Sequence, residues 1–184
     1  MALILASASP RRRQLLKRLR RPFVIDASHV SEATSEKNPR KLVLLLAKRK
    51  ALAIARKRPG DVVIGADTTV ACLGKILNKP KDVRDAVRML NLQNGRWQRV
   101  YTGVVVAAEG GRRLVGAAEV TKVKFRRVDP ALLAKVAGKH LDKAGAYAVQ
   151  DKKDPFVEKV VGPRDNVVGL PVETVRKLLK RLRA

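Results

Sequence analysis

Hydrophobic residues along this chain follow two different spacings, and each spacing predicts a type of secondary structure. Short runs of consecutive apolar residues predict buried strands at 2–6, 23–25, 62–64 and 69–72. Other segments repeat apolar residues every three or four positions, which is the period of a helix with one buried face. We expect these helices to begin near Pro10, Pro39, Asp82, Pro130 and Pro171.

Capping residues support the predicted helix starts. The pairs Ser9-Pro10, Asn38-Pro39 and Asp129-Pro130 each place a good N-cap before a proline at the first helical position. Asp82 is a fourth N-cap, and Asn94-Gly95 is a stop signal for the helix that it opens. The second helix is expected to reach about Lys57 and the fourth about Ala137.

The later part of the chain predicts a long hairpin. Two extended apolar segments, Val100 to Ala108 and Leu114 to Phe125, flank the turn sequence Glu109-Gly110-Gly111. Strands and helices therefore alternate early, and the hairpin comes late. This order predicts an α/β fold with a mixed sheet. A length of 184 residues suits one ordinary domain or two small lobes that share a core, and we expect a single domain over residues 1–184.

The chain is strongly basic. It has 41 Lys and Arg against 16 Asp and Glu, a net charge of +25 over 184 residues. Such a charge attracts nucleotides, nucleic acids or an anionic membrane surface. Aromatic residues are only 3% of the chain, which leaves few platforms for stacking on single-stranded bases. Charge alone therefore does not make this a nucleic-acid-binding protein.

The lack of a recognisable targeting signal and the single cysteine favour a cytoplasmic protein. No run approaches the roughly 20 apolar residues of a membrane span, and the apolar start lacks the preceding basic residues of a signal peptide. Cys72 is the only cysteine, which excludes an internal disulfide and suits a reducing compartment. We interpret Cys72 as a small buried hydrophobe.

Three arginines, Arg11, Arg12 and Arg13, lie in the first turn of the first predicted helix. A helix N-terminus carries a partial positive charge, so each cation there costs about 0.3–1 kcal/mol. Either the turn is solvated and the cost is tolerated, or an anion binds there. Backbone N–H groups, serine hydroxyls and arginines at one helix start favour an anion site.

Three further residues are candidates for the same chemistry. Lys50 lies on the inward stripe of the second helix, where it either reaches back to the surface or points into a polar cleft. Asp67 follows a predicted apolar strand. It is either a carboxylate that takes part in ligand binding, as is common at strand ends, or an N-cap or turn residue. Lys79 precedes Pro80, which holds its backbone extended. Cations with a few carboxylates are what phosphoryl chemistry requires.

The sequence resembles a known protein family. The segments LASASPRRRQLL, GADTTV, Lys79-Pro80, YTGV, LDKAGAY with Gln150 beyond it, and NVVGLP are similar to those of the Maf family of nucleoside triphosphate pyrophosphatases. The similarity runs through nearly the whole chain in the same order, and that order is more specific than any single motif.

The resemblance implies a fold, a reaction and a cofactor. The fold would be that of inosine triphosphate pyrophosphatases: an elongated mixed sheet flanked by helices, with two lobes around a cleft. The reaction would hydrolyse a nucleoside triphosphate between the α and β phosphates, with Mg²⁺ or Mn²⁺, and so remove nucleotides from the pool. dTTP and UTP are the expected substrates, with CTP and modified pyrimidine nucleotides as further candidates. A homodimer is typical of the family.

The resemblance also assigns roles to residues. Asp67 matches the general base, while Lys50 and Lys79 match cations that act on the phosphates. Ser7, Arg11 and Arg12 match further phosphate-binding positions, and Glu32, together with Asp67, matches the metal-associated carboxylates. The positions that sort substrates toward dTTP and UTP correspond to Arg11, Thr68 and Gln150.

Three features depart from the family pattern. Ser31 stands where an aspartate is common, Asn78 replaces a glycine before Lys79, and residues 151–155 replace a glycine-rich turn. Two other functions stay open beside the enzyme: a regulator of cell division with a vestigial site, and a basic protein that binds nucleic acid.

Overall fold

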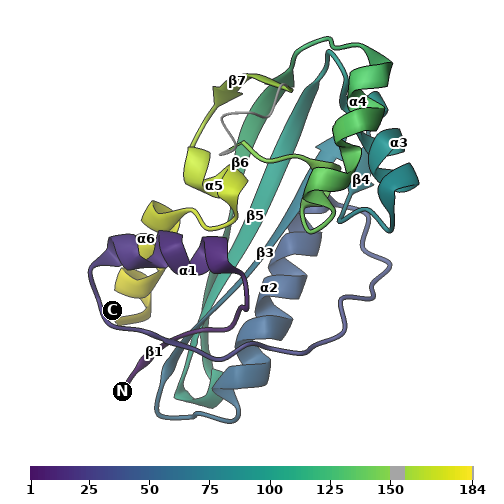
Figure 1. The fold of residues 1–184 in the computed structure, drawn as a ribbon. Coiled ribbons are helices and arrows are strands. Elements are labelled where there is room, and N and C mark those ends of the chain that lie inside the picture. The colour runs from purple at the N-terminus through teal and green to yellow at the C-terminus, as the bar shows by residue number, and fades with distance from the viewer. Residues whose placement is uncertain (150–155, 184) are drawn as a thin grey trace. The chain divides into compact units, whose positions relative to one another are not determined.

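The computed structural model describes residues 1–149 and 156–183, and these residues form an α/β structure around a mixed sheet (Figure 1). The expected fold class is confirmed. The chain divides into two compact units. Unit 1 contains Met1–Asp67, Thr102–Glu119 and Gly169–Ala184, and unit 2 contains Thr68–Tyr101 and Val120–Val168.

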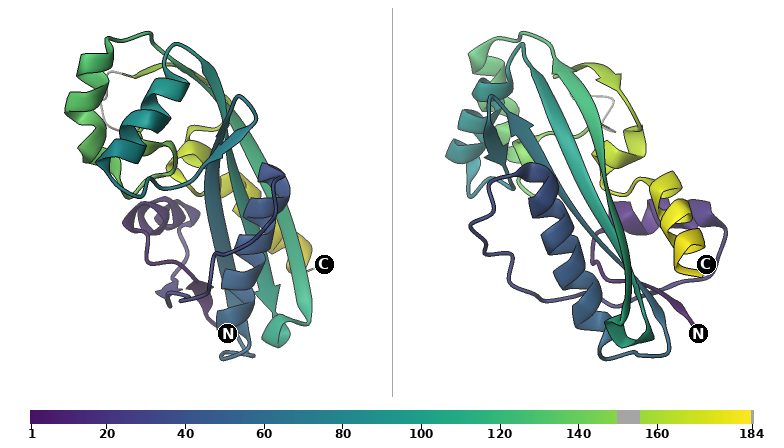
Figure 2. Two further views of the ribbon diagram at one scale, coloured as in Figure 1. Left: turned by 90° about the vertical axis from the view of Figure 1, so that its right-hand side faces the viewer. Right: turned by 180° about the vertical axis from the view of Figure 1, so that it is seen from behind.

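Three long strands contribute residues to both units: β3 (Val62–Cys72), β5 (Trp97–Ala108) and β6 (Arg113–Phe125), visible as the longest arrows in Figure 2. In unit 1, β1 (Leu3–Leu5) pairs in parallel with β2 (Val24–Ile25) and with β3. The strand order there is β2-β1-β3-β5-β6. β5 and β6 are joined by the predicted hairpin turn, in which Gly110 and Gly111 have positive φ.

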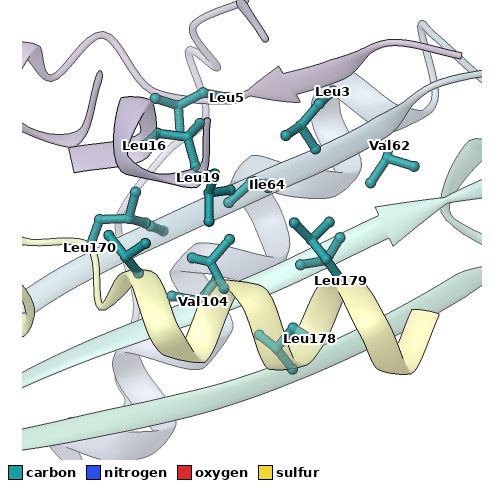
Figure 3. Close-up of a cluster of buried hydrophobic side chains, with 14 of the residues drawn as sticks. Leu3, Leu5, Leu16, Leu19, Val62, Ile64, Val104, Leu170, Leu178 and Leu179 are labelled. Atoms are coloured by element: carbon teal, nitrogen blue, oxygen red, sulfur yellow. The ribbon is translucent and has the colours of Figure 1, made fainter. Parts of the chain in front are cut away.

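Helices cover both faces of the sheet in unit 1. Alternate strand residues such as Leu5, Ile64 and Val104 pack against α1 (Pro10–Leu16), the short helix η1 (Lys17–Leu19) and α6 (Val172–Arg183), as Figure 3 shows. The intervening strand residues, among them Ile4 and Val63, pack instead against α2 (Pro39–Ala55). The period of two along each strand thus divides the core into two layers.

Two glycines let α2 approach the sheet closely. A Cβ on Gly65 of β3 would lie 2.2 Å from the carbonyl oxygen of Ala47, and one on Gly103 of β5 would lie 2.4 Å from that of Val43. Any side chain at either strand position would therefore collide with the backbone of α2. This close approach sets the height of α2 above the sheet and with it the position of Lys50.

Unit 2 contains the other halves of the long strands and smaller elements around them. β4 (Lys75–Leu77) pairs antiparallel with β3, and β7 (Val157–Val161) pairs antiparallel with β6. The helices are α3 (Val83–Gln93), α4 (Pro130–Val136), η3 (Ala137–His140), η4 (Ala144–Ala146) and α5 (Arg164–Val168). At the centre of this core the Phe125 ring contacts Tyr147 edge-on at 4.8 Å and stacks on Phe156 at 5.7 Å.

The predicted helix starts are confirmed. Ser9, Asn38, Asp82 and Asp129 each accept a hydrogen bond from a backbone N–H in the first turn of the helix that follows. Each cap satisfies at least one of the N–H groups that a helix start leaves without an intrahelical partner, and Asn38 satisfies two. Predicted helix ends differ from the observed ones by one or two residues, as expected for frayed termini.

One strand prediction was wrong. The two separate runs predicted at 62–64 and 69–72 are a single strand, so Asp67 lies within β3 and does not end it. The strand continues because it changes neighbours: Ile64 is the last residue opposite β1, and Val70 is the first opposite β4. Asp67 lies in the interval where neither strand pairs with this edge of β3.

No helix in the described part of the chain has the length and apolar character needed to cross a membrane.

Candidate active site

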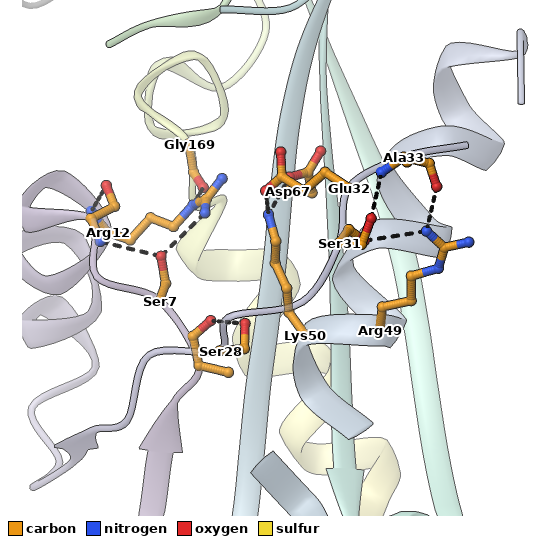
Figure 4. Close-up of polar contacts among 12 residues, drawn as sticks. Ser7, Arg12, Ser28, Ser31, Glu32, Ala33, Arg49, Lys50, Asp67 and Gly169 are labelled. Carbon is orange, nitrogen blue, oxygen red and sulfur yellow. Dashed lines mark hydrogen bonds and ion pairs between the residues drawn. The ribbon is translucent and has the colours of Figure 1, made fainter. Parts of the chain in front are cut away.

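A lysine and two carboxylates form the centre of the polar cluster in unit 1. The Lys50 ammonium lies 2.6 Å from Oδ1 of Asp67 and 2.6 Å from Oε1 of Glu32 (Figure 4). Lys50 and Asp67 are buried, at 9% and 8% exposure, whereas 54% of the Glu32 side chain is exposed. Of the two interpretations left open for Lys50, the structure therefore selects the polar site.

Local structure explains why these groups meet. Lys50 lies on the buried side of α2, one turn before Ile54, and Gly65 lets that helix approach β3. Asp67 is two residues after Gly65, beyond the last residue of β3 that pairs with β1. The carboxylate therefore lies at the end of the parallel part of the sheet, where ligands of α/β proteins commonly bind.

The environment of Asp67 changes its acidity. Burial raises the pKa of the Asp67 carboxyl above its ordinary value, and the negative charge of Glu32 adds to this effect. The positive charges of Lys50 and Arg12 and the hydrogen bond from Lys50 act in the opposite direction. A carboxylate with a raised pKa is a stronger base than an exposed aspartate, which suits proton abstraction near neutral pH.

Arg12 is held in place by two acceptors. Its Nε donates to the carbonyl oxygen of Gly169 at 2.9 Å, and its NH1 donates to Oγ of Ser7 at 3.2 Å (Figure 4). The Ser7 hydroxyl also accepts from the backbone N–H of Ser9 at 3.3 Å. Ser7 is buried at 8% exposure, so its hydroxyl orients Arg12 from within the fold.

The first turn of α1 has no acidic residue, and Arg11 lies close enough to Arg12 to influence its charge. Burial lowers the pKa of the Arg12 guanidinium; the charge of Asp67 opposes this shift and that of Arg11 adds to it. The negative charges of Asp67 and, to a smaller extent, Glu32 therefore act on the cations at this helix start, and further negative charge there would be stabilising.

Glu32 belongs to the long loop before α2, and Arg49 anchors that loop. The Arg49 guanidinium donates to the backbone carbonyls of Ser31 at 3.3 Å and Ala33 at 2.9 Å, on either side of Glu32. Sequence reasoning missed Arg49 because a surface arginine in a basic helix carries no distinguishing signal. It also missed the carbonyl of Gly169, although Gly169 lies in the motif NVVGLP.

The remaining predicted residues belong to unit 2 or lie outside the described residues. Thr68 is the first residue of unit 2 and follows Asp67 directly. The exposed Lys79 lines a pocket of about 750 Å³ together with Lys81, Arg84 and Arg88 and the helix-capping residues Asp82 and Asp85. Within residues 1–149 and 156–183, the Lys79 ammonium has no hydrogen-bond or ion-pair partner. Gln150 lies outside the described residues.

A chain of hydrogen bonds holds the backbone next to Lys79. The hydroxyl of the buried Thr69 donates to the side-chain oxygen of Asn78 at 2.8 Å, and the N–H of Gly145 donates to the Asn78 carbonyl at 3.2 Å. Gln93 in turn donates to the Gly145 carbonyl at 2.7 Å. Asn78, which departs from the family pattern, thus forms a side-chain bond that a glycine could not form.

The carboxylates of Asp67 and Glu32 have the chemistry to contribute to a divalent-cation site. Asp67 and Glu32 already place one oxygen each at 2.6 Å from the same ammonium nitrogen. The described residues contain no group of three or more His, Cys, Asp or Glu able to hold a metal alone. Magnesium is commonly held by one or two carboxylates, with water and substrate phosphates as its other ligands. The donor set matches that pattern.

Comparison with known proteins identifies the family of this chain. The family described as Maf-like protein matches residues 2–182. A dTTP/UTP pyrophosphatase of Elusimicrobium minutum is 44% identical over 180 residues, 98% of each chain. One of Thermococcus onnurineus is 47% identical over 178 residues, 96% of this chain and 95% of its own. One of Deinococcus radiodurans is 42% identical over 179 residues, covering 96% and 91%.

Among solved structures, a nucleoside-triphosphatase, dITP/XTP pyrophosphatase, of Mycobacterium abscessus aligns with 100% of this chain and 96% of its own, at a TM-score of 0.46 and 15% identity. The family match, in contrast, is a match of sequence that extends over almost every residue. Because of that match, and because relatives share more than two fifths of their residues with it over nearly their whole length, this chain belongs to the Maf-like protein family.

Proposed function

We propose that this protein hydrolyses dTTP and UTP to the nucleoside monophosphate and pyrophosphate, and so removes these nucleotides, CTP and modified pyrimidine nucleotides from the pool. The observation that carries the proposal is the buried Asp67, held at 2.6 Å by Lys50 next to the arginine-rich start of α1. Full-length relatives named dTTP/UTP pyrophosphatases support the choice of substrate.

Asp67 is the proposed general base. The oxygen of a water molecule attacks the α-phosphorus, and Asp67 accepts the proton that this water loses. The bond between the α-phosphorus and the oxygen bridging to the β-phosphorus breaks, and pyrophosphate leaves with that electron pair. Lys50 keeps the base oriented through its hydrogen bond to Oδ1.

The cations have the task of binding and stabilising charge. Arg12, oriented by Ser7 and Gly169, and its neighbour Arg11 would bind phosphate oxygens at the start of α1. Lys79 is the other cation proposed to act on phosphate oxygens. Cations placed where charge develops in the transition state stabilise it strongly, because they need no reorganisation during the reaction.

Asp67 and Glu32 would hold the divalent cation, which supplies positive charge against the phosphate oxygens when bound. Because Lys50 contacts both carboxylates, it also keeps them close together in the absence of the cation. Base selection is assigned to Arg11, Thr68 and Gln150, and the protein is expected to act as a homodimer in the cytoplasm. Light scattering of the purified chain tests the dimer.

The reaction is tested by incubating the protein with dTTP and Mg²⁺ in ¹⁸O-labelled water. We expect dTMP and pyrophosphate as products, with the label in dTMP because water attacks the α-phosphorus. Release of dTDP and phosphate, or label in pyrophosphate, would contradict the proposal. Parallel reactions with UTP, CTP, GTP and ITP rank the bases, and a preference for purines would exclude the assigned substrate class.

The role of Asp67 is tested with Asp67→Asn, which keeps the shape of the side chain and removes the base. A positioned general base is worth about 10²–10⁴-fold in rate. We expect kcat for dTTP to fall by that amount, while circular dichroism stays unchanged. Asp61→Asn is the matched control, since in the described residues the Asp61 side chain accepts a hydrogen bond only from the backbone N–H of Ala2. Near-native turnover by Asp67→Asn would remove Asp67 from this role.

A further inference from the structure

The packing of α1, η1 and α6 brings two basic segments together on one surface of unit 1. Leu16 and Leu19 share a hydrophobic cluster with Val175, Leu179 and other residues of α6 (Figure 3). The Arg176 guanidinium donates to the backbone carbonyl of Arg18 at 2.8 Å, which joins the two segments at their surface. Both bury their apolar sides in the same layer, so their polar sides face solvent together.

These polar sides are almost entirely cationic. Residues 10–21 and 172–183 contain twelve Lys and Arg but only one acid, Glu173, whereas the whole chain has 41 and 16. We call the exposed cations of these segments the α1–α6 surface, and its members are Arg13, Lys17, Arg18, Arg20, Arg21, Arg176, Lys177, Lys180 and Arg181. Arg11 and Arg12 are less exposed and belong to the candidate active site.

The composition of this surface indicates the kind of partner. Neither segment contains Phe, Tyr or Trp, so no aromatic side chain is available to stack on single-stranded bases. None of the large hydrophobic side chains exposed in the described residues lies on α1, η1 or α6, so an apolar anchor for a membrane or a protein interface is missing there. The α1–α6 surface therefore offers a partner positive charges at helical spacing.

Regularly spaced cations without apolar contacts fit the phosphate backbone of a nucleic-acid duplex. Arg176 and Lys180 are four residues apart on α6, as are Lys177 and Arg181, which is about 6 Å along the helix axis. Contacts between such cations and phosphates do not depend on the base sequence, and they release counterions from the nucleic acid. We propose that the α1–α6 surface binds double-stranded nucleic acid through its phosphates, as an activity separate from nucleotide hydrolysis.

The test compares two triple variants of equal net charge. Lys177→Gln, Lys180→Gln and Arg181→Gln remove three cations of the α1–α6 surface and keep good helix formers. Arg56→Gln, Lys57→Gln and Arg112→Gln remove three exposed cations elsewhere in unit 1. Binding to a fluorescent 30-base-pair DNA is measured by anisotropy across a series of NaCl concentrations, with thermal unfolding as a check on the fold.

For the unchanged protein we expect log K to fall linearly with log of the NaCl concentration. The first triple variant should lose at least about tenfold in affinity at 50 mM NaCl, with a slope smaller by about three, because each phosphate contact contributes about 0.9 to the slope. The second variant should lose less than threefold. In both variants kcat at saturating dTTP should stay unchanged, so the outcome does not depend on the hydrolytic site.

Three results would overturn the proposal. Equal losses in the two variants would assign binding to the overall charge and not to this surface. Tighter binding to poly-glutamate or to vesicles of anionic phosphatidylglycerol than to the duplex would identify another class of partner. Absence of duplex binding at 50 mM NaCl would remove the activity altogether.

Discussion

At the scale of single residues, the decisive feature is the shared ammonium of Lys50. One nitrogen at 2.6 Å from two carboxylates explains how a buried aspartate tolerates its burial, because an opposite charge compensates part of the desolvation cost. The compensation is incomplete, since the pKa of Asp67 is still raised. Ionised Asp67 is therefore less stable in the fold than an exposed carboxylate would be, which costs some stability of the native state.

This imbalance predicts a pH dependence of stability in the metal-free protein. Because burial raises the pKa of Asp67, the native state holds this proton more strongly than the unfolded chain does. The stability that protonated Asp67 contributes is therefore fully present below its pKa of about 3.9 in the unfolded chain. This stability is lost as the pH rises through the higher pKa of the native state. The free energy of unfolding of the parent, relative to Asp67→Asn, should decrease over that interval.

Urea unfolding in EDTA between pH 3.5 and 7 measures both proteins. The comparison with Asp67→Asn cancels groups that both share, including Asp85, whose pKa is lowered by its hydrogen bond to Arg88. A difference in free energy that grows with pH would mean that Lys50 and Arg12 outweigh burial at Asp67.

At the scale of elements, the site depends on how closely α2 lies over the sheet. Gly65 and Gly103 remove the side chains that would hold the helix away, and the helix then delivers Lys50 to Asp67. At the N-terminal end of α1, contacts with other segments also position a functional group. The Ser7 hydroxyl and the Gly169 carbonyl accept hydrogen bonds from Arg12 and hold its side chain. The functional groups are therefore positioned by packing between elements.

We predict that Gly65→Ala destabilises the fold and displaces Lys50. The new Cβ would lie 2.2 Å from the Ala47 carbonyl oxygen and 2.7 Å from the Ala51 nitrogen, so α2 must shift. Overpacking of this kind costs about 1–3 kcal/mol, which lowers Tm by roughly 2–4 °C per kcal/mol in a chain of this size. Gly60→Ala is the control because nothing lies within 4 Å of its Cβ. Calorimetry showing equal Tm values would contradict the close-approach argument.

A second prediction concerns the loop that carries Lys79. Asn78→Gly should cost about 1–3 kcal/mol, because the hydroxyl of Thr69, which is 0% exposed, loses the acceptor at 2.8 Å. Thr69→Val should cost less, since it removes the buried hydroxyl and leaves the exposed Asn78 to water. The double variant should therefore be more stable than Asn78→Gly alone. Urea unfolding of all three forms the test, and simple additivity of the two costs would refute the coupling.

At the scale of the whole molecule, charge is the dominant property. The net charge of +25 on 184 residues opposes compaction through self-repulsion, while it attracts anionic substrates over long range. The cations are not spread evenly, since twelve of the 41 lie in residues 10–21 and 172–183. One property of the sequence thus has two consequences, a cost in stability and a surface for polyanions.

Salt should therefore stabilise this protein. The Debye length falls from about 30 Å at 0.01 M to about 3 Å at 1 M, which screens repulsion between exposed cations. A relief of about 2 kcal/mol would raise Tm by roughly 4–8 °C for a chain of this length. We expect this rise between 0.02 and 0.5 M NaCl by differential scanning fluorimetry, and a smaller rise in the Lys177, Lys180 and Arg181 glutamine variant. A Tm that falls with NaCl would show that favourable ion pairs outweigh repulsion.

Much of the fold and part of the site followed from the sequence by itself. The helix starts at Ser9, Asn38, Asp82 and Asp129, the hairpin and the α/β class were predictable, because capping and periodicity act between residues a few positions apart. The order of motifs also identified the family and named Asp67, Lys50 and Glu32 as candidates. Their roles as base, cation and metal ligand stay predictions, as does that of Gln150.

Only the tertiary structure decided how these groups meet. The sequence left Lys50 open between solvent and a polar site and placed Asp67 at the end of a strand, yet Lys50 is buried against Asp67 within a continuous β3. The sequence did not indicate the contacts made by Arg49 and by the Gly169 carbonyl. The reason is physical: these contacts join residues 16 to 157 positions apart, and their distances depend on how closely one element packs on another.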